Sequence, residues 1–333
     1  LYSVWAGAND VFVASGAVAA LIPPPADPVG YLVTTATELV GEVARLQTAG
    51  ARFILVPNLP DIGKTPAALL SGPAAIAGFT ALSSAFNDAL FTGIVNAGLQ
   101  VIPVDTRSLF DEIIASPGTF GLLDVTNPAC GAWTNPFTGA FGLRSSLFCT
   151  SADFVAADAD KLLLFADGVH PTTAGHKILS DYVIALLEAP AKISLLAEAP
   201  IKTRTTLVNA IYNQIRGAFW RRPHSPPEVW VTFDVAKTRY LQGAGAAARG
   251  TTTPAGVTVG FDMKLRPNLL VGVAGTAAFY EPDFTGGGHF EQSELALTFY
   301  GAYRRGRIGL DVVGVIGDID YDEVMREITL GNA

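Results

Sequence analysis

The spacing of apolar residues changes once along this chain, near residue 228, and the two parts cannot fold in the same way. Before that point, unbroken apolar runs such as residues 52–57 are separated by segments with helical spacing, such as residues 32–46. After it, apolar residues alternate one by one with small or polar residues, as in 229–236 and 257–265. A period of 3.6 is typical of helices, and a period of two is typical of strands with two different faces.

The first part predicts an α/β fold with a parallel sheet. Strands are expected at residues 1–6, 52–57, 99–104 and 162–165, and helices at about 32–49, 79–97 and 173–187. The run at 52–57 has no polar alternation, as expected where helices cover both faces of a sheet. Residues 1–6 are predicted to be a buried strand that leads into Gly7-Ala8-Asn9-Asp10. Because the sequence begins inside this strand, we expect it to be a fragment that lacks its beginning.

The second part predicts an outer-membrane β-barrel. Its connections alternate between long ones, at 240–254 and 281–289, and tight ones, at 266–268 and 304–306. Half of the chain is hydrophobic and 16% is charged, yet no run approaches the ~18–20 apolar residues of a membrane helix. A membrane barrel has this composition because alternation spreads out its lipid-facing residues. A soluble β-sandwich is the alternative, although its strands would be shorter.

The predicted barrel is incomplete. Five alternating stretches are clear, and a sixth strand is expected near 324–330. A closed bacterial barrel needs at least about eight strands. We therefore expect the chain to be cut at its C-terminal end as well. Between the two parts, apolar positions such as Leu207, Ile211 and Ile215 predict a long helical segment over about 190–222.

Asp167 and His170 form the strongest chemical motif, in the segment Asp167-Gly168-Val169-His170-Pro171-Thr172. A carboxylate three residues before a histidine can hold one ring nitrogen and leave the other free to act as a base. The alternative reading is a helix cap beside an incidental histidine.

The two cysteines, Cys130 and Cys149, lie in a stretch rich in Gly, Pro and Asn. A disulfide between them would close a loop of about 20 residues and stabilise the fold by roughly 3 kcal/mol. Such a bond implies an oxidising compartment outside the cytoplasm. Two unrelated buried thiols are the alternative.

The segment Gly7-Ala8-Asn9-Asp10 and the segment 167–172 together resemble two motifs of the SGNH, or GDSL-type, hydrolases. These are serine esterases with a flavodoxin-like three-layer fold. The resemblance covers about residues 1–188. It implies that Asn9 is an oxyanion-hole donor and that Asp167 and His170 are the acid and base of a catalytic triad. The family's nucleophile lies in a Gly-Asp-Ser block, and no such tripeptide occurs in this sequence. We expect that block upstream of Leu1, so the fragment itself is expected to be inactive.

A hydrolase domain, a helix and a barrel in this order resemble the esterase autotransporters, which are type V secreted enzymes. The resemblance implies a truncated hydrolase domain at 1–188, a linker helix in the barrel lumen at 189–224, and a truncated antiparallel barrel at 225–333. It places the protein in the outer membrane, with the hydrolase domain on the cell surface. The basic residues of the helix are expected to face acidic lumen groups such as Asp234 or Asp262; they are Lys202, Arg204, Arg216, Arg221 and Arg222.

These observations predict a surface-anchored carboxylic-ester hydrolase that uses an acyl-enzyme mechanism. Its partners would be an acyl-ester substrate and outer-membrane lipid, and it would act as a monomer without a cofactor. The net charge of −8 argues against a nucleic-acid partner. No metal is expected: Asp167 and His176 could supply two ligands of a metal site, but no third ligand is evident near them. A catalytically silent surface adhesin and a carbohydrate O-acetylesterase are the alternatives.

Overall fold

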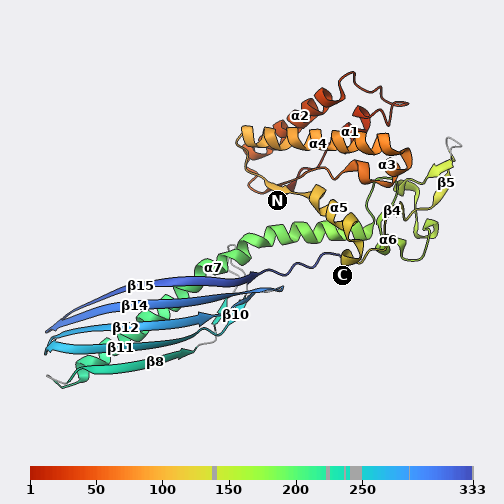
Figure 1. Cartoon of the computed structure of the whole chain (residues 1–333). Coiled ribbons are helices and arrows are strands. Elements are labelled where there is room, and N and C mark those ends of the chain that lie inside the picture. Colours follow the sequence, from red (N-terminus) through yellow and green to blue (C-terminus); the bar gives the residue numbers. More distant parts are fainter. Residues whose placement is uncertain (137–140, 223–225, 236–237, 241–249, 285, 332–333) are drawn as a thin grey trace. The chain divides into compact units, whose positions relative to one another are not determined.

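The computed structural model describes residues 1–333 except 137–140, 223–225, 236–237, 241–249, 285 and 332–333 (Figure 1). The chain divides into two compact units. The first comprises Leu1–Ile184 with Thr329–Ala333, and the second comprises Ala185–Ile328. The division at residue 184 lies close to the boundary expected at 188, and each unit is described by itself.

The first unit contains the predicted parallel sheet. Strands β1 (Tyr2–Ser3), β2 (Ile54–Pro57) and β3 (Ile102–Val104) pair in parallel in the order β1-β2-β3. A second parallel pair joins β4 (Asp124–Pro128), which the sequence analysis missed, to β7 (Leu163–Phe165). All four residues of β2 are buried, as its unbroken apolar run predicts.

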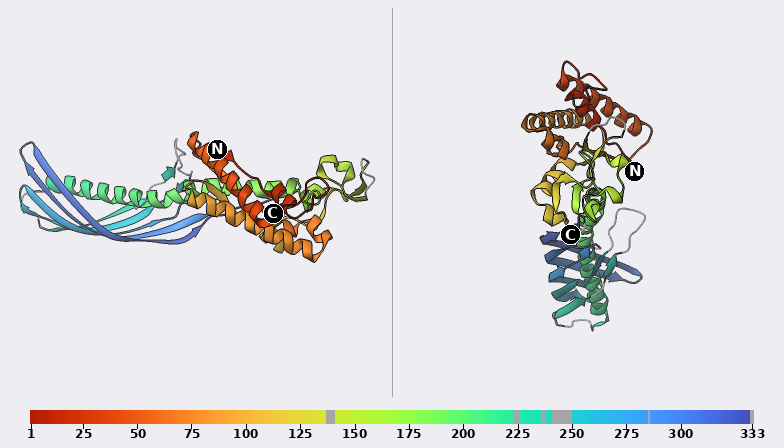
Figure 2. Two further views of the ribbon diagram at one scale, coloured as in Figure 1. Left: turned by 90° about the horizontal axis from the view of Figure 1, so that it is seen from above. Right: turned by 90° about the vertical axis from the view of Figure 1, so that its right-hand side faces the viewer.

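Helices pack around these strands and form the core of the first unit. They are α1 (Ala8–Ala14), α2 (Pro28–Thr48), η1 (Ile62–Lys64), α3 (Pro66–Ser71), α4 (Pro73–Asn96), α5 (Thr106–Ala115) and η2 (Pro117–Phe120). One cluster joins Leu32 and Val40 of α2 to Phe86 and Leu90 of α4 and to Ile54 of β2. Figures 1 and 2 show α2 and α4 lying side by side. Asp27 caps α2, and Asp105 caps α5.

Two predictions for this unit are wrong. Residues 1–6 are not a buried strand, because β1 lies at the edge of the sheet and both Tyr2 and Trp5 are exposed. In addition, α4 has the length and composition of a membrane span, contrary to the expectation that no stretch approaches one. Its buried Phe86 and Leu90 belong to the core of the first unit, so we interpret α4 as a core helix.

The segment between β4 and β7 forms a small lobe. It contains the hairpin β5 (Ala132–Thr134) and β6 (Phe141–Leu143), the turns η3 (Ser146–Phe148) and η4 (Ser151–Asp153), and the short helix α6 (Ala159–Leu162). The Sγ atoms of Cys130 and Cys149 are bonded at 2.05 Å across this lobe. Trp133 stacks on Phe148, with ring centroids 5.7 Å apart.

Helix α7 runs without interruption from Thr173 to Trp220. The sequence analysis expected two helices with a break near 188. Pro190 and Pro200 lie inside α7 but do not end it. Each proline removes one backbone hydrogen bond. Alanine precedes both prolines, and Ala191 follows the first; alanine is a strong helix former and favours a continuous helix.

The second unit contains a curled antiparallel sheet of long strands. They are β8 (Glu228–Val235), β11 (Ala255–Arg266), β12 (Leu269–Tyr280), β14 (His289–Arg305) and β15 (Ile308–Met325), paired in this order. Short strands β9 (Thr238–Tyr240), β10 (Gly250–Thr252) and β13 (Asp283–Phe284) extend the sheet near the start of β14. The tight connections lie where predicted, while residues 241–249 and 285 of the long ones are outside the described residues.

The concave face of this sheet holds α7 (Figure 2). Leu207, Ile211 and Ile215 of α7 pack there against Trp230 and Tyr300 of the sheet. The acid Asp262, which is fully buried, accepts hydrogen bonds from Arg221 at 2.5 Å, Gln214 at 2.8 Å and Tyr300 at 3.0 Å. Arg221 and Asp262 thus pair as predicted.

Arg204 has a different partner from those predicted. It forms an ion pair with the buried Glu294 of β14, which the sequence analysis did not anticipate. Glu294 also accepts a hydrogen bond from Thr203.

The convex face of the sheet is apolar and exposed. It carries the residues that alternate with the buried ones: Val229, Val231, Phe233, Val235, Val259, Phe261, Leu295, Leu297, Phe299, Ile308, Leu310 and Val312. A water-facing sheet would bear polar residues there. An apolar outer face and a polar inner face are the arrangement of a transmembrane β-barrel.

The expected sixth strand near 324–330 does not form. Strand β15 extends to Met325 and takes up Val324, and residues 326–330 have no regular secondary structure. Leu330 packs instead against the core of the first unit, and the Gly331 N–H donates to Asp181 Oδ2 at 3.0 Å.

Candidate active site

An apolar pocket of about 320 Å³ lies in the first unit and contains Asn9 and His170 in its wall. Most of the wall is aromatic or aliphatic, formed by Trp5, Phe12, Leu59, Ile62, Phe110, Ile114, Phe165, Val169 and Leu179. The structure therefore brings together two residues that are 161 positions apart in the sequence (170 minus 9). Asp167 lies behind His170 and is buried.

The segment that carries Asp167 and His170 is a closed turn at the end of β7. The Ala166 N–H donates to the His170 carbonyl at 2.7 Å. Thr172 immediately precedes α7: its hydroxyl accepts from Gly175 N–H at 3.2 Å and donates to the Leu163 carbonyl at 2.6 Å. A Cβ on Gly175 would lie 3.0 Å from the Leu164 carbonyl oxygen, so the helix packs tightly on the strand. These bonds fix the positions of both side chains.

The Asp167 carboxylate accepts three backbone hydrogen bonds. Val169 and His170 donate to Oδ1 at 2.9 and 2.8 Å, and Ser146 donates to Oδ2 at 2.7 Å. Burial alone would raise the pKa of Asp167, but the bonds from His170, Ser146 and Val169 outweigh it and lower the pKa to about 2. The carboxylate is therefore ionised at neutral pH, as required of a group that orients an imidazole.

The His170 ring is held at one nitrogen and open at the other. Its Nδ1 lies 3.0 Å from Asp167 Oδ1 and 2.9 Å from Oδ2. Because the carboxylate only accepts, Nδ1 must carry the proton and Nε2 is left with a lone pair. The side chain is 65% exposed, so Nε2 is accessible to a reactant. This is the arrangement of a general base.

Asn9 lies in the first turn of α1, two residues after Gly7. No other residue could replace this glycine without strain. Gly7 has φ +111°, and a Cβ there would lie 2.3 Å from Phe86 Cζ. The neighbouring Asp10 accepts a hydrogen bond from Tyr31 of α2 at 3.2 Å. Asp10 thus ties the loop to α2, while Asn9 lines the pocket.

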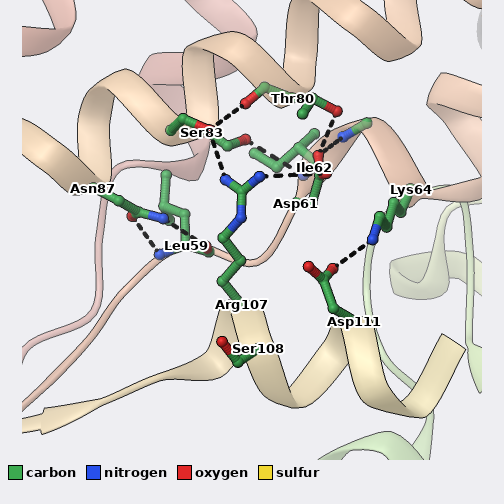
Figure 3. A network of polar contacts seen from close by, with 12 residues as sticks. Leu59, Asp61, Ile62, Lys64, Thr80, Ser83, Asn87, Arg107, Ser108 and Asp111 are labelled. Atoms are coloured by element: carbon green, nitrogen blue, oxygen red, sulfur yellow. Dashed lines mark hydrogen bonds and ion pairs between the residues drawn. The ribbon is translucent and has the colours of Figure 1, made fainter. Parts of the chain in front are cut away.

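A polar network that the sequence analysis did not identify supports the other wall of the pocket (Figure 3). Asp61, which lines the pocket, is buried and accepts from Gly63 N–H at 2.9 Å and Thr80 Oγ1 at 2.8 Å. Figure 3 shows Arg107 reaching from α5 toward it, and Arg107 Nη2 lies 3.6 Å from Asp61 Oδ2. The Asn-Leu-Pro-Asp-Ile-Gly segment at 58–63 was the available signal, because Asp and Gly in a loop favour such a turn.

Of the described histidines, His176 and His289 show no catalytic geometry, and His224 lies outside the described residues. His176 lines the pocket but lies on α7, with Nδ1 2.9 Å from the Thr172 carbonyl oxygen. In the described parts of the chain, one group could hold a metal ion: His289, Glu291 and Glu323 of the second unit, with ligand atoms within 4.8 Å of one another. The sequence analysis assigned no role to His289.

The fold and the pocket define a class: an α/β domain with an Asp–His pair and an asparagine at an apolar pocket, joined to a curled antiparallel sheet that holds a helix. Residues 1–183 match the GDSL-like lipase/acylhydrolase model, and residues 229–333 match the autotransporter beta-domain. The chain belongs to the GDSL-like lipase/acylhydrolase family.

Three curated proteins are similar to most or all of this chain, and the match covers about half of their own length. A Pseudomonas putida protein, called an uncharacterized protein in the trpE-trpG intergenic region, is 30% identical over 99% of this chain and 52% of its own length. Esterase EstA of Pseudomonas aeruginosa is 32% identical over 84% of this chain and 42% of its own length. Lipase 1 of Photorhabdus luminescens is 24% identical over the whole chain and 56% of its own length. The chain spans about half the length of these relatives.

Proposed function

We propose that the protein is a serine-type carboxylic-ester hydrolase, with Asp167, His170 and Asn9 in its catalytic site. The observation that carries this proposal is the pair of contacts from His170 Nδ1 to the ionised Asp167, at the edge of an apolar pocket that Asn9 also lines. A surface adhesin would have no use for this geometry. The names of two relatives, esterase EstA and lipase 1, agree with it.

The proposed reaction proceeds through an acyl-enzyme. His170 Nε2 removes the proton of a serine hydroxyl as its oxygen attacks the ester carbonyl, and Asp167 holds the imidazolium that forms. The Asn9 side-chain amide donates to the developing oxyanion, and a donor of this kind lowers a barrier by roughly 3 kcal/mol. His170 then gives its proton to the departing alcohol. Water repeats these steps to release the acid.

The nucleophile is the part of this proposal that the chain does not contain in its expected form. No Gly-Asp-Ser tripeptide occurs in the 333 residues, and we predict that the gene encodes one upstream of the codon for Leu1. Ser3 is a poor substitute, because it lies in β1 and is absent from the pocket wall.

The pocket wall suggests the class of ester. Its aromatic and aliphatic side chains would bury a hydrocarbon chain, which contributes about 0.8 kcal/mol per CH₂ removed from water. A sugar-bound acetate offers little apolar surface to such a wall. We therefore propose acyl esters with an aliphatic chain as substrates.

We further propose that the second unit anchors the protein in the outer membrane as a monomer, with the first unit on the cell surface. The exposed apolar face of strands β8, β11, β14 and β15 supports contact with lipid. The match of residues 229–333 to the autotransporter beta-domain supports the same location.

Covalent labelling tests the enzymatic proposal. The full-length gene product is treated with a fluorophosphonate, whose phosphorus is attacked by an activated serine with loss of fluoride, and the modified peptide is mapped by mass spectrometry. We expect one adduct on the serine of a Gly-Asp-Ser block, and its loss in His170→Ala. Labelling that His170→Ala leaves unchanged would contradict the assignment of the base.

A further inference from the structure

The lobe that the disulfide closes begins directly beside the proposed catalytic acid. After β4, the Ala129 N–H donates to the Phe165 carbonyl at 2.8 Å, and the Cys130 N–H donates to the Ala166 carbonyl at 2.9 Å. Ala166 is the residue before Asp167. Cys130 is therefore tied by its backbone to the strand end that carries the acid.

The other end of the lobe returns to the same carboxylate. The Ser146 N–H donates to Asp167 Oδ2 at 2.7 Å. Ser146 begins the short turn η3, and the Cys149 N–H donates to the Ser146 carbonyl at 3.2 Å. Cys149 is bonded to Cys130. The disulfide thus closes a ring of contacts that passes through Ala166, Asp167 and Ser146.

The Ser146 donor differs from the other two that hold Asp167. Val169 and His170 donate to Oδ1 from within the same turn as the acid, so local sequence supplies them. Ser146 lies 21 positions earlier and donates to Oδ2. Besides this bond, Oδ2 contacts His170 Nδ1 itself, and the Ser146 hydroxyl also hydrogen-bonds the carboxylate. Loss of the Ser146 bond would let the carboxylate rotate about Oδ1 and leave the imidazole less well oriented.

We propose that the Ser146 backbone N–H, held in place by the Cys130–Cys149 disulfide, is a positioning element for the catalytic acid. This inference rests on the proposed function of Asp167 and His170. It gives the disulfide a role in the reaction rather than in stability alone. Because disulfides form outside the cytoplasm, the acid would be fully positioned only after export.

A proline substitution isolates this donor. Ser145 has φ −67° and ψ 139°, which is the conformation that residues before proline prefer. Ser146 is the first residue of η3, where the missing N–H and fixed φ of proline are tolerated. Ser146→Pro therefore removes the donor within allowed backbone angles, and it places the ring Cδ next to Asp167 Oδ2 in place of the hydrogen. Ser146→Ala keeps the donor and serves as the matched control.

The experiment measures kcat and KM of the full-length gene product for p-nitrophenyl butyrate. Ser146→Ala removes only the hydroxyl, which also hydrogen-bonds Asp167, and should keep kcat within about threefold of wild type. Ser146→Pro lacks both the hydroxyl and the N–H, and we expect its kcat to be on the order of 10-fold lower than that of Ser146→Ala with an unchanged KM. Cys130→Ser with Cys149→Ser should lower kcat by a smaller factor. Adding both changes to Ser146→Pro should have no further effect, because the disulfide acts through this donor.

Two results would overturn the proposal. In one, Ser146→Pro retains the kcat of Ser146→Ala. In the other, the kcat of the triple variant falls by the product of the two separate factors, which would show that the disulfide acts independently of the Ser146 donor. If His170→Ala is inactive while Ser146→Pro is fully active, this inference fails and the proposed function stands. If His170→Ala remains active, the proposed function fails.

Reduction of the wild-type protein provides a second test that does not depend on the folding of a variant. A water-soluble phosphine transfers two electrons to the disulfide, and one water molecule supplies the two protons of the thiols and the oxygen of the phosphine oxide. We expect kcat to fall when two free thiols are titrated and to return after reoxidation. An unchanged kcat with two free thiols would also overturn the proposal.

Discussion

The ring of Phe86 occupies the space that a side chain on Gly7 would need, with Phe86 Cζ 2.3 Å from the position of a Cβ. Gly7 also has φ +111°, which L-residues rarely adopt. This contact between α4 and the start of α1 sets the position of the loop that presents Asn9. It links the core of the first unit directly to the pocket.

Gly7→Ala should therefore destabilise the first unit by roughly 2–4 kcal/mol, because both the contact and the backbone are strained. Thermal unfolding followed by tryptophan fluorescence would measure the change. Gly41→Ala is the matched control: no atom lies within 4 Å of its Cβ position, and it is an exposed residue of α2. That substitution should stabilise by about 0.5–1 kcal/mol. Equal effects of the two substitutions would refute the packing argument.

The low pKa of Asp167 predicts a specific dependence of stability on acid. The pKa falls from 3.8 to about 2 on folding, because backbone donors hold the ionised form against the effect of burial. The ionised carboxylate thus contributes roughly 2 kcal/mol at neutral pH, fully present above pH ~4 and lost as pH falls toward ~2. Urea unfolding of wild type and Asp167→Asn should show a stability difference that shrinks over this range. A difference that is constant with pH would contradict the assigned pKa.

The buried pair of Arg221 and Asp262 should be sensitive to the loss of one partner. Arg221→Met leaves a buried carboxylate without its charged partner and should cost about 3–5 kcal/mol. Adding Asp262→Asn should restore much of the stability, because it removes the charge. Arg216→Met, at an exposed residue near the end of α7, is the control and should have little effect. Migration of unheated and heated protein in detergent gels would report the transition. A double variant as unstable as Arg221→Met would count against a paired charge.

The proposed lipid contact predicts a dependence on depth along the strands. Leu297 lies at the middle of β14 and is exposed on the convex face, whereas Ile308 begins β15 next to a tight turn. A lysine at the bilayer midplane costs roughly 2–4 kcal/mol, and one near the interface costs about 0–1. Leu297→Lys should therefore reduce folded protein in outer-membrane fractions much more than Ile308→Lys. Equal amounts of the two variants would argue that this face contacts water.

Local patterns were sufficient to predict much of this fold. The period of two gave all five long strands and their tight turns, because alternation depends only on which face of the sheet is buried. Asp105 and the start of α7 at Thr173 were readable from capping preferences. The Asp167 and His170 contact was also predictable, since a separation of three residues brings the two side chains together within one turn.

Contacts between distant segments were not predictable in the same way. The exposure of β1 depends on its place at the edge of the sheet. Helix α7 continues through Pro190 and Pro200, although local rules predict that a proline ends a helix. The donor from Ser146 to Asp167 arises from the path of a lobe 21 residues upstream. The pairing of Arg204 with Glu294 depends on the register of α7 against β14, and the two residues are 90 positions apart in the chain. Short sequence patterns do not indicate contacts between residues so far apart in the chain.

The role of His170 is most directly tested by steady-state hydrolysis of p-nitrophenyl butyrate by the full-length gene product. His170→Ala should lower kcat on the order of 10⁴-fold, because it removes the base of the triad. His176→Ala is the control, since His176 lines the same pocket but lacks a carboxylate partner among its contacts in the described residues. That variant should keep kcat within about threefold of wild type. A His170→Ala variant as active as His176→Ala would show that the Asp167–His170 pair does not perform the reaction.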